Sequence, residues 1–267
     1  MIHSLFTAAA ACLAADTADR KVDASVAAAS AFARGELLAH DDSSLPESIR
    51  MPGRPPRPRL VHPRALPQRK LGGSEGRAAF IHAIAHIEFN AIDLAWDAVY
   101  RFRGMPAEYY ADWVAIASDE ARHFTLLRAR LQALGHDYGD FDAHNGLWEM
   151  AERTAHDGLA RMALVPRVLE ARGLDVTPGM IVKLRAHNDA ATADILELIL
   201  REEIAHVAAG SRWFRWHCQR AGVVPERRFR ELLTQYARDV LRGPFNREAR
   251  AAAGFSEQEL AALEAAL

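Results

Sequence analysis

Two short stretches decide the fold: EARH at residues 120–123 and EIAH at residues 203–206. In each stretch a glutamate and a histidine stand three positions apart, which places both side chains on one face of an α-helix. A further glutamate precedes each stretch at almost the same interval, because Glu88 lies 32 residues before Glu120 and Glu170 lies 33 residues before Glu203. One Glu from each of two helices, with a Glu-x-x-His from each of two others, is the ligand pattern of a two-metal site in a four-helix bundle.

The residues around these glutamates are apolar at helical spacing. The stripe around Glu88 comprises Ile81, Ile84, Ala85, Ile92, Ala95 and Val99. Similar stripes surround Glu120 and Glu203, whereas the stripe around Glu170 is shorter and contains Pro166, which is expected to kink the helix. A carboxylate on a core-facing stripe costs several kcal/mol unless it is paired or bound to metal. The pattern therefore favours buried metal ligands over solvated helix faces.

The donor types indicate the metal. Carboxylates bridge hard divalent cations, and imidazole adds a nitrogen donor suited to iron. Four carboxylates neutralise two divalent ions, and a set without thiolates favours two iron ions, with manganese as the alternative. The predicted ligands are Glu88, Glu120, His123, Glu170, Glu203 and His206, with bridging expected from Glu120 and Glu203. A single Glu-x-x-His pair arises by chance in a chain of this composition, and a bundle that has lost its metals stays open as an alternative.

Other candidate ligands fit less well. His82 and His86 stand four positions apart on one predicted helix and form a rival metal-binding pair, although no carboxylate partner stands out. Glu202 and Asp119 neighbour the predicted ligands in sequence but point about 100° away around the helix. We expect the two histidines to be hydrogen-bonded within the protein or exposed, and Glu202 and Asp119 to lie outside the ligand set or in solvent.

Composition excludes several classes of protein. The chain has 267 residues, half of them hydrophobic, and a formal charge of −2, which predicts neither nucleic-acid nor membrane affinity. Cys12 and Cys218 are its two cysteines, so a rubredoxin-type iron centre is excluded and a reducing, cytoplasmic location is expected. No apolar run reaches transmembrane length. Residues 4–15 are expected to form an amphipathic helix, with a signal peptide as the alternative.

The chain divides into three parts, and no strand is predicted. Residues 1–73 form an N-terminal helical segment followed by a basic, proline-rich strap at 50–70, residues 74–222 form the metal-binding bundle, and residues 223–267 form a C-terminal helical extension packed on the bundle. The expected bundle helices cover about 74–102, 107–134, 146–172 and 189–221, with a crossover at 136–145. We expect the third helix to close at Gly173, a short helix to start at Thr177-Pro178, and Ser256 with Glu259 to form a capping box.

The strap has seven basic residues and no acidic one between Arg50 and Lys70. An extended segment lying over the bundle is the simpler interpretation, because prolines interrupt regular structure. A basic strip that binds an anionic partner, such as RNA or a phosphate, is the alternative.

Several segments resemble the family called domain of unknown function 455. They are Gly53-Arg54-Pro55, Ala85-His86-Ile87-Glu88, Asp119 to Phe124, Glu170 to Asp175, Arg201 to His206 and Gly243 to Arg250. The resemblance covers nearly the whole chain and includes all six predicted ligands. It implies an all-α, ferritin-like fold with a carboxylate-bridged di-metal site. A more distant similarity, of motif and superfamily alone, is to ferritin-like tRNA hydroxylases that use dioxygen.

These observations favour a di-iron oxidoreductase that activates O2 as a co-substrate and acts as an oxidase or monooxygenase. Its substrate would be a small organic molecule or a modified nucleoside. An external reductase would supply electrons, because the sequence has no flavin or nicotinamide fingerprint. The alternatives are a ferroxidase that handles iron, a rubrerythrin-like peroxide reductase, and a scaffold that metals only stabilise. A homodimer is the alternative to a monomeric protein.

Overall fold

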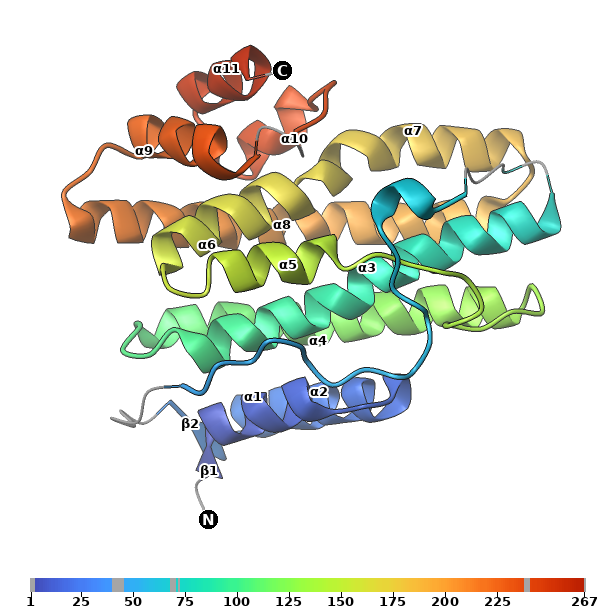
Figure 1. The fold of residues 1–267 in the computed structure, drawn as a ribbon, viewed down its shortest axis with the longest axis horizontal. Helices are drawn as coiled ribbons and strands as arrows, with labels where there is room; N and C mark the ends of the chain where they lie inside the picture. Colours follow the sequence, from blue (N-terminus) through green and yellow to red (C-terminus); the bar gives the residue numbers. More distant parts are fainter. Residues whose placement is uncertain (1–2, 40–45, 68–70, 72, 238–240, 267) are drawn as a thin grey trace. The chain divides into compact units, whose positions relative to one another are not determined.

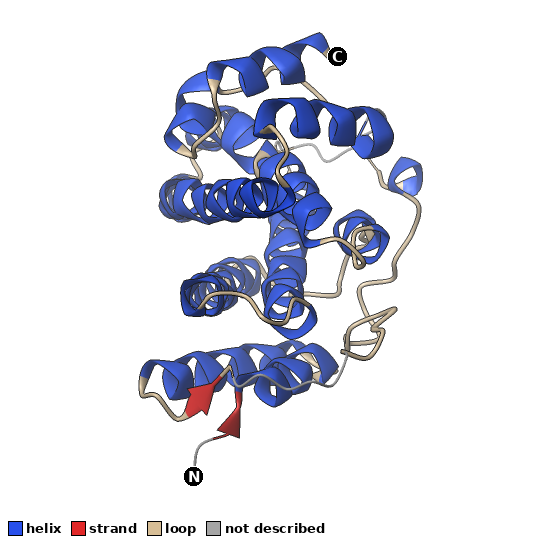
Figure 2. Cartoon of the chain, turned by 90° about the vertical axis from the view of Figure 1, so that its left-hand side faces the viewer, coloured by secondary structure: helices blue, strands red, loops and turns tan. Residues whose placement is uncertain are grey.

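The chain is almost entirely helical. A computed structural model describes residues 3–39, 46–67, 71, 73–237 and 241–266, and nearly all of the regular structure in them is α-helix (Figure 2). The prediction of an all-α protein is therefore confirmed. The prediction of no strand is wrong in one detail, since β1 (His3–Ser4) pairs in parallel with β2 (Leu37–Leu38). Strands of two residues are too short to show an alternating pattern in the sequence.

The described residues form two compact units, 1–152 and 153–267. The division falls inside the range 74–222 that the sequence analysis assigns to one bundle. In the first unit, the long helices α3 (Ser74–Arg101) and α4 (Ala107–Gln132) form a hairpin. Helix α1 (Leu5–Ala14) packs on α3 and α2 (Ala18–Ala33) packs on α4 (Figure 1). The N-terminal helices are thus part of the same core as the α3–α4 hairpin.

The strap lies against other parts of the first unit, and its only described helical turn is η1 (Pro63–Ala65). The backbone N–H of Val61 donates to Ala143 O at 2.8 Å, and the Trp148 indole N–H donates to Arg50 O at 2.8 Å. Gly53 packs so closely on α1 that a Cβ atom there would lie 2.3 Å from Ala14 O. Two further basic residues of the predicted strip, Arg69 and Lys70, lie outside the described residues.

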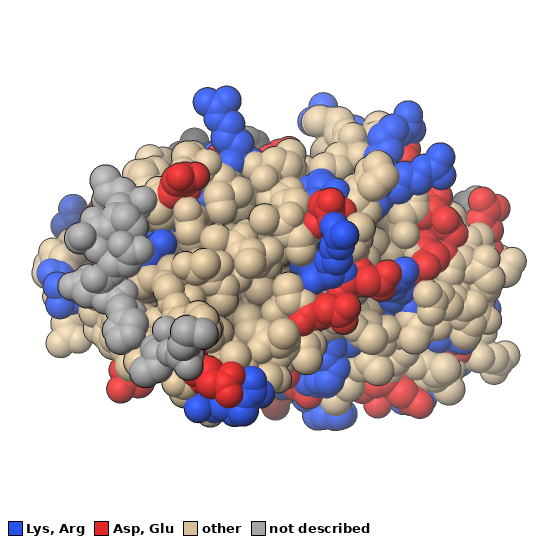
Figure 3. Space-filling view, turned by 90° about the horizontal axis from the view of Figure 1, so that it is seen from below, with Lys and Arg blue, Asp and Glu red and all other residues tan. Residues whose placement is uncertain are grey.

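The charged groups of the strap that the structure describes are partly neutralised. Arg59 forms an ion pair with Asp142 at 2.5 Å, and Arg54 donates to Asn145 Oδ1 at 3.2 Å. On the face of the molecule drawn in Figure 3, basic and acidic side chains are interspersed. The structure thus describes a strap held by main-chain and side-chain contacts within its own unit.

The second unit is built on the long helix α8 (Ala190–Ala221). Helix α6 (Gly158–Leu164), a π-helical turn η2 (Val165–Glu170) and α7 (Arg172–Ala186) follow one another and pack along α8 (Figure 1). The C-terminal part adds four short elements: α9 (Pro225–Leu232), the π-helical η3 (Leu233–Ala237), α10 (Arg247–Ala252) and α11 (Glu257–Ala265).

The predicted third helix needs correction. The expected helix at 146–172 is interrupted, because α5 (Gly146–Arg153) ends at Arg153. A new helix, α6, begins at Gly158, and the Asp157 side chain caps it by accepting from the N–H groups of Leu159 and Ala160. The predicted break at Gly173 and start at Thr177-Pro178 are wrong, since α7 continues through Pro178.

Helix α7 accommodates Pro178 because the carbonyl that loses its usual backbone donor accepts a hydrogen bond from another group. Pro178 has no N–H to offer the carbonyl of Leu174 four residues earlier. The side-chain amide of Asn246 donates to that oxygen instead, at 3.1 Å. The predicted capping box at Ser256 and Glu259 is confirmed at the start of α11.

Candidate metal centre

Three of the six predicted ligands converge inside the first unit. Glu88 lies on α3, and Glu120 and His123 lie on α4; their exposed fractions are 5%, 2% and 0%. The His123 Nδ1 atom lies 3.3 Å from Glu88 Oε2 and 3.4 Å from Glu120 Oε2. Each of the three residues offers one ligand atom within 4.8 Å of those of the other two. Two buried carboxylates and one imidazole therefore meet at one point between α3 and α4.

The ionisation of this cluster reflects burial and mutual charge. Burial, followed by the neighbouring charge of Glu120, raises the pKa of Glu88 to about 8, although His123 opposes the shift. Burial by itself would lower the pKa of His123, but its contacts with Glu120 and Glu88 outweigh burial and raise that pKa to about 11. In the metal-free protein the cluster thus retains protons that a divalent cation would displace.

Aromatic side chains fix the relative rotation of α3 and α4 beside these ligands. Phe89 follows Glu88, Phe124 follows His123, and their ring centroids lie 5.3 Å apart. The Tyr138 ring lies 5.0 Å from each of the two phenylalanine rings. Packing between these rings helps to fix how α3 and α4 are rotated against each other.

The same helix α3 buries two aspartates that the sequence analysis did not single out. Asp93 is ion-paired with Lys21 of α2 at 2.5 Å, and both side chains are at most 1% exposed. Asp97 is ion-paired with Arg101 one helical turn away, at 2.6 Å. The second pair has a recognisable i, i+4 spacing, whereas Lys21 and Asp93 stand far apart in the sequence and carry no local signal.

The rival pair, His82 and His86, is hydrogen-bonded to the loop at 136–145. His82 Nε2 accepts from the N–H of Gly139 at 3.0 Å. The His86 ring nitrogens lie 2.9 Å from the Tyr138 hydroxyl and 3.0 Å from His144 O. Burial lowers the pKa of His86 to about 3, which keeps its ring neutral. Both histidines thus have structural partners, as the sequence analysis expects.

The other three predicted ligands lie in the second unit. Glu203 and His206 stand one turn apart on α8, with His206 Nδ1 lying 3.1 Å from Glu203 Oε1. His206 is buried and Glu203 is half-buried. Glu170 is the last residue of η2 and is also half-buried.

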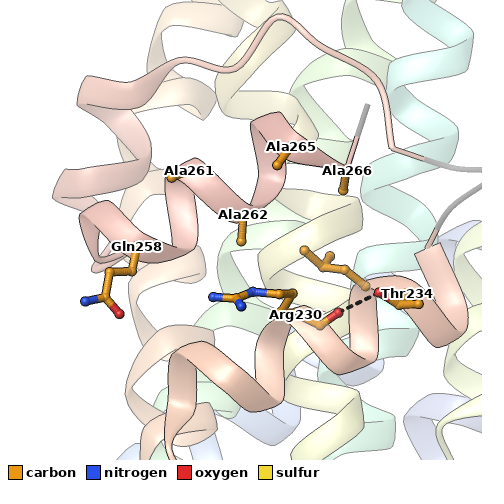
Figure 4. A pocket seen from close by; sticks show the side chains of 8 residues that line it. Arg230, Thr234, Gln258, Ala261, Ala262, Ala265 and Ala266 are labelled. Atoms are coloured by element: carbon orange, nitrogen blue, oxygen red, sulfur yellow. Dashed lines mark hydrogen bonds between the residues drawn. The ribbon is translucent and has the colours of Figure 1, made fainter.

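The donor set fits a divalent metal ion. Carboxylate oxygen and imidazole nitrogen without thiolate suit iron or manganese, and a divalent cation could replace the protons that balance the buried cluster in its absence. By contrast, a hollow of about 790 Å³ between α9–η3 and α11 has no acidic, histidine or cysteine side chain in its lining. Arg230, Thr234 and the alanines of α11 line it, and Thr234 Oγ1 donates to Arg230 O at 3.0 Å (Figure 4). That hollow is therefore unrelated to the ligands.

Comparison with known proteins places the chain among relatives without a described reaction. The profile of a family described as "Protein of unknown function (DUF455)" matches residues 14–261. A protein of Haemophilus influenzae, described as "Uncharacterized protein", is 47% identical over 213 residues, which cover 77% of this chain and 74% of that protein. No solved structure matches. In the described part of the chain, no helix is both long and apolar enough to span a membrane.

Proposed function

The chain belongs to the DUF455 family, and we propose that it is a non-haem di-iron protein of the ferritin-like superfamily that activates O2. The observation that carries the proposal is the convergence of Glu88, Glu120 and His123 in the core of the first unit. Burying two carboxyl groups and an imidazole together is costly, and without a metal ion the cluster balances its charge only by holding protons that a divalent cation would displace.

The second unit supplies the remaining ligands in this proposal. Two carboxylates and one imidazole are too few for two iron ions, which together need about ten to twelve donor positions including solvent and bridging groups. Glu170, Glu203 and His206 repeat the donor types of the first set in the same chain order. We therefore propose that all six residues are ligands of one ferritin-like di-iron site, in which Glu120 and Glu203 would be the bridging ligands.

When bound, two ferrous ions would supply the electrons that reduce O2. The chain's own residues would hold the ions, and the near-complete burial of Glu88, Glu120 and His123 gives them water-poor surroundings. Such surroundings favour oxidation of an organic substrate over the loss of oxidising equivalents to water. The proposed reaction is therefore that of an oxidase or monooxygenase acting on a small molecule or a modified nucleoside, with an external reductase as electron donor.

Iron handling or peroxide reduction is the competing function. The same ligands serve a ferroxidase or a rubrerythrin-like reductase. However, α1 and α2 cover α3 and α4 in the first unit, and α9 to α11 extend the second. A storage shell needs only a plain bundle, whereas these additions are suited to building a substrate pocket.

Anaerobic loading with Fe(II), followed by exposure to O2, tests the proposal. We expect two irons per chain and a magnetically coupled diferric pair in the Mössbauer spectrum. Substrate-independent turnover of peroxide, or a large cage-like oligomer that accumulates ferric mineral, would favour the competing functions. A wild-type chain that binds fewer than two irons would refute the di-iron proposal.

A further inference from the structure

The turn that carries Glu170 is π-helical. The N–H of Ala171 donates to Pro166 O, five residues earlier, at 2.9 Å. A π-turn adds one residue to the helical repeat and often marks a functional site, because it changes the direction of the side chains at its end. The direction of Glu170 therefore depends on what holds this turn in its widened form.

Arg250 of α10 is hydrogen-bonded to two carbonyls of this turn. Its Nη1 donates to Arg167 O and its Nη2 donates to Ala171 O, each at 3.3 Å. These two carbonyls precede and follow Glu170 in the chain. The Asp175 carboxylate holds the same guanidinium through Nε at 2.9 Å and Nη2 at 2.7 Å. Arg250 is 1% exposed, so these bonds form in the protein interior, where they are strongest.

Arg167, inside the same turn, is anchored to the C-terminal part and to α8. Its guanidinium lies 2.8 Å from Glu259 Oε2 of α11, and its Nε donates to Ser211 Oγ of α8 at 3.1 Å. Three aromatic rings lie within 5 Å of the guanidinium carbon, at 4.7, 4.4 and 4.3 Å for Phe214, Phe229 and Phe255 respectively. The charge is thus enclosed by cation–π contacts and one ion pair.

Gly210 lets the turn approach α8. A Cβ atom at this position would lie 2.4 Å from Pro166 Cγ, which is a steric clash. Gly210 also follows His206 by one helical turn on the same helix. The position of η2 is therefore set by α8 on one side and by α10 and α11 on the other.

From these contacts we infer that Arg250 is a positioning residue for the metal ligand Glu170. The C-terminal part of the chain thus has a role in the metal site: it holds the π-turn so that the Glu170 carboxylate has one fixed direction. This inference rests on the proposed di-iron function, in which Glu170 binds metal. Residues that orient metal ligands typically change metal affinity by about 10–100-fold when they are replaced.

Anaerobic equilibrium dialysis with Fe(II) alone, read as irons bound per chain at each free iron concentration, tests the inference. The test variant is Arg250→Lys, which keeps the charge but loses the planar fork. Arg247→Lys on the same helix is the matched control, because Arg247 is half-exposed and pairs with Glu257 and Glu264 at the surface. Glu170→Ala and the double variant Glu170→Ala/Arg250→Lys complete a double-mutant cycle. Circular dichroism checks that each variant is folded.

We expect Arg250→Lys to weaken binding of the second iron by about 10–100-fold, Arg247→Lys to bind as the wild type, and the double variant to match Glu170→Ala. Wild-type affinity in folded Arg250→Lys, or additive losses in the double variant, would overturn the inference while leaving the di-iron proposal standing. Failure of the wild type to bind two irons would overturn both.

A second variant covers the case in which Arg250→Lys does not fold. Asp175→Asn keeps the shape of the side chain but places an amide nitrogen or a neutral oxygen against Arg250. The same selective weakening of the second iron is expected, and undiminished binding in this folded variant would refute the inference.

Discussion

Replacing Lys21 by Met should destabilise the protein in a way that depends on pH through Asp93. The Lys21 ammonium lies 2.5 Å from the Asp93 carboxylate, and it also donates to Cys12 O at 3.1 Å. Burial raises the pKa of Asp93 to about 6 even though Lys21 lowers it. Without Lys21 the folded-state pKa must rise further above the unfolded value of about 3.9.

The sign and the size of the effect follow from proton linkage. Where the folded state binds a proton that the unfolded state has lost, stability falls as the pH rises, by about 1.4 kcal/mol for each pH unit. In the wild type this fall ends near pH 6, where Asp93 ionises in the folded protein. In Lys21→Met it continues upward to the higher pKa. The variant should therefore lose about 2 kcal/mol more than the wild type between pH 6 and pH 8, because the wild-type carboxyl is already half ionised at pH 6.

Guanidinium chloride unfolding at pH 6, 7 and 8, followed by circular dichroism, measures this difference. The double variant Lys21→Met/Asp93→Asn is the control, because it lacks the titrating carboxyl and should follow the pH dependence of the wild type. Stability curves of wild type and Lys21→Met that stay parallel from pH 6 to pH 8 would refute the assignment of a buried pair.

Three further outcomes are expected. Glu120→Ala or His206→Ala should sharply lower the iron content measured by plasma mass spectrometry while leaving helical circular dichroism largely intact; full occupancy in either variant would mean that the ligands are wrongly assigned. Burial raises the pKa of Cys12 to about 12, so that roughly one thiol in ten thousand is ionised at pH 8, and Ellman's reagent should leave this thiol unmodified in the native protein and react with it after unfolding. Gly53→Ala should cost about 1–3 kcal/mol, because the new Cβ would lie 2.3 Å from Ala14 O; an unchanged denaturation midpoint would contradict that packing.

The long helices, and the position of Glu120 and His123 on one face of α4, could be predicted from the sequence because both depend on local spacing. Apolar residues at helical intervals predict α3, α4 and α8, and a Glu-x-x-His pair lies on one helix face whatever surrounds it. The structure brings Glu88 to Glu120 and His123, whereas the metal itself remains a prediction.

Features that depend on distant partners were not accessible in the same way. Lys21 and Asp93 find each other only when α2 packs beside α3, and no spacing rule connects them. Pro178 resembles the first residue of a helix, yet it lies inside α7 because Asn246 satisfies the carbonyl that the proline abandons. The bridging of η2 by Arg250 is hidden for the same reason, since its partners stand far apart in the chain.

In the proposed di-iron protein, the α3–α4 hairpin would set the order in which the ligands come together during synthesis. Glu88, Glu120 and His123 all precede residue 133, and the contacts that bring them together lie within one pair of consecutive helices. N-terminal segments fold first as a chain leaves the ribosome, and local helix pairs form quickly. We expect a nascent chain to present three possible metal donors before Glu203 and His206 have been translated, so that a first ion could enter before the proposed site is complete.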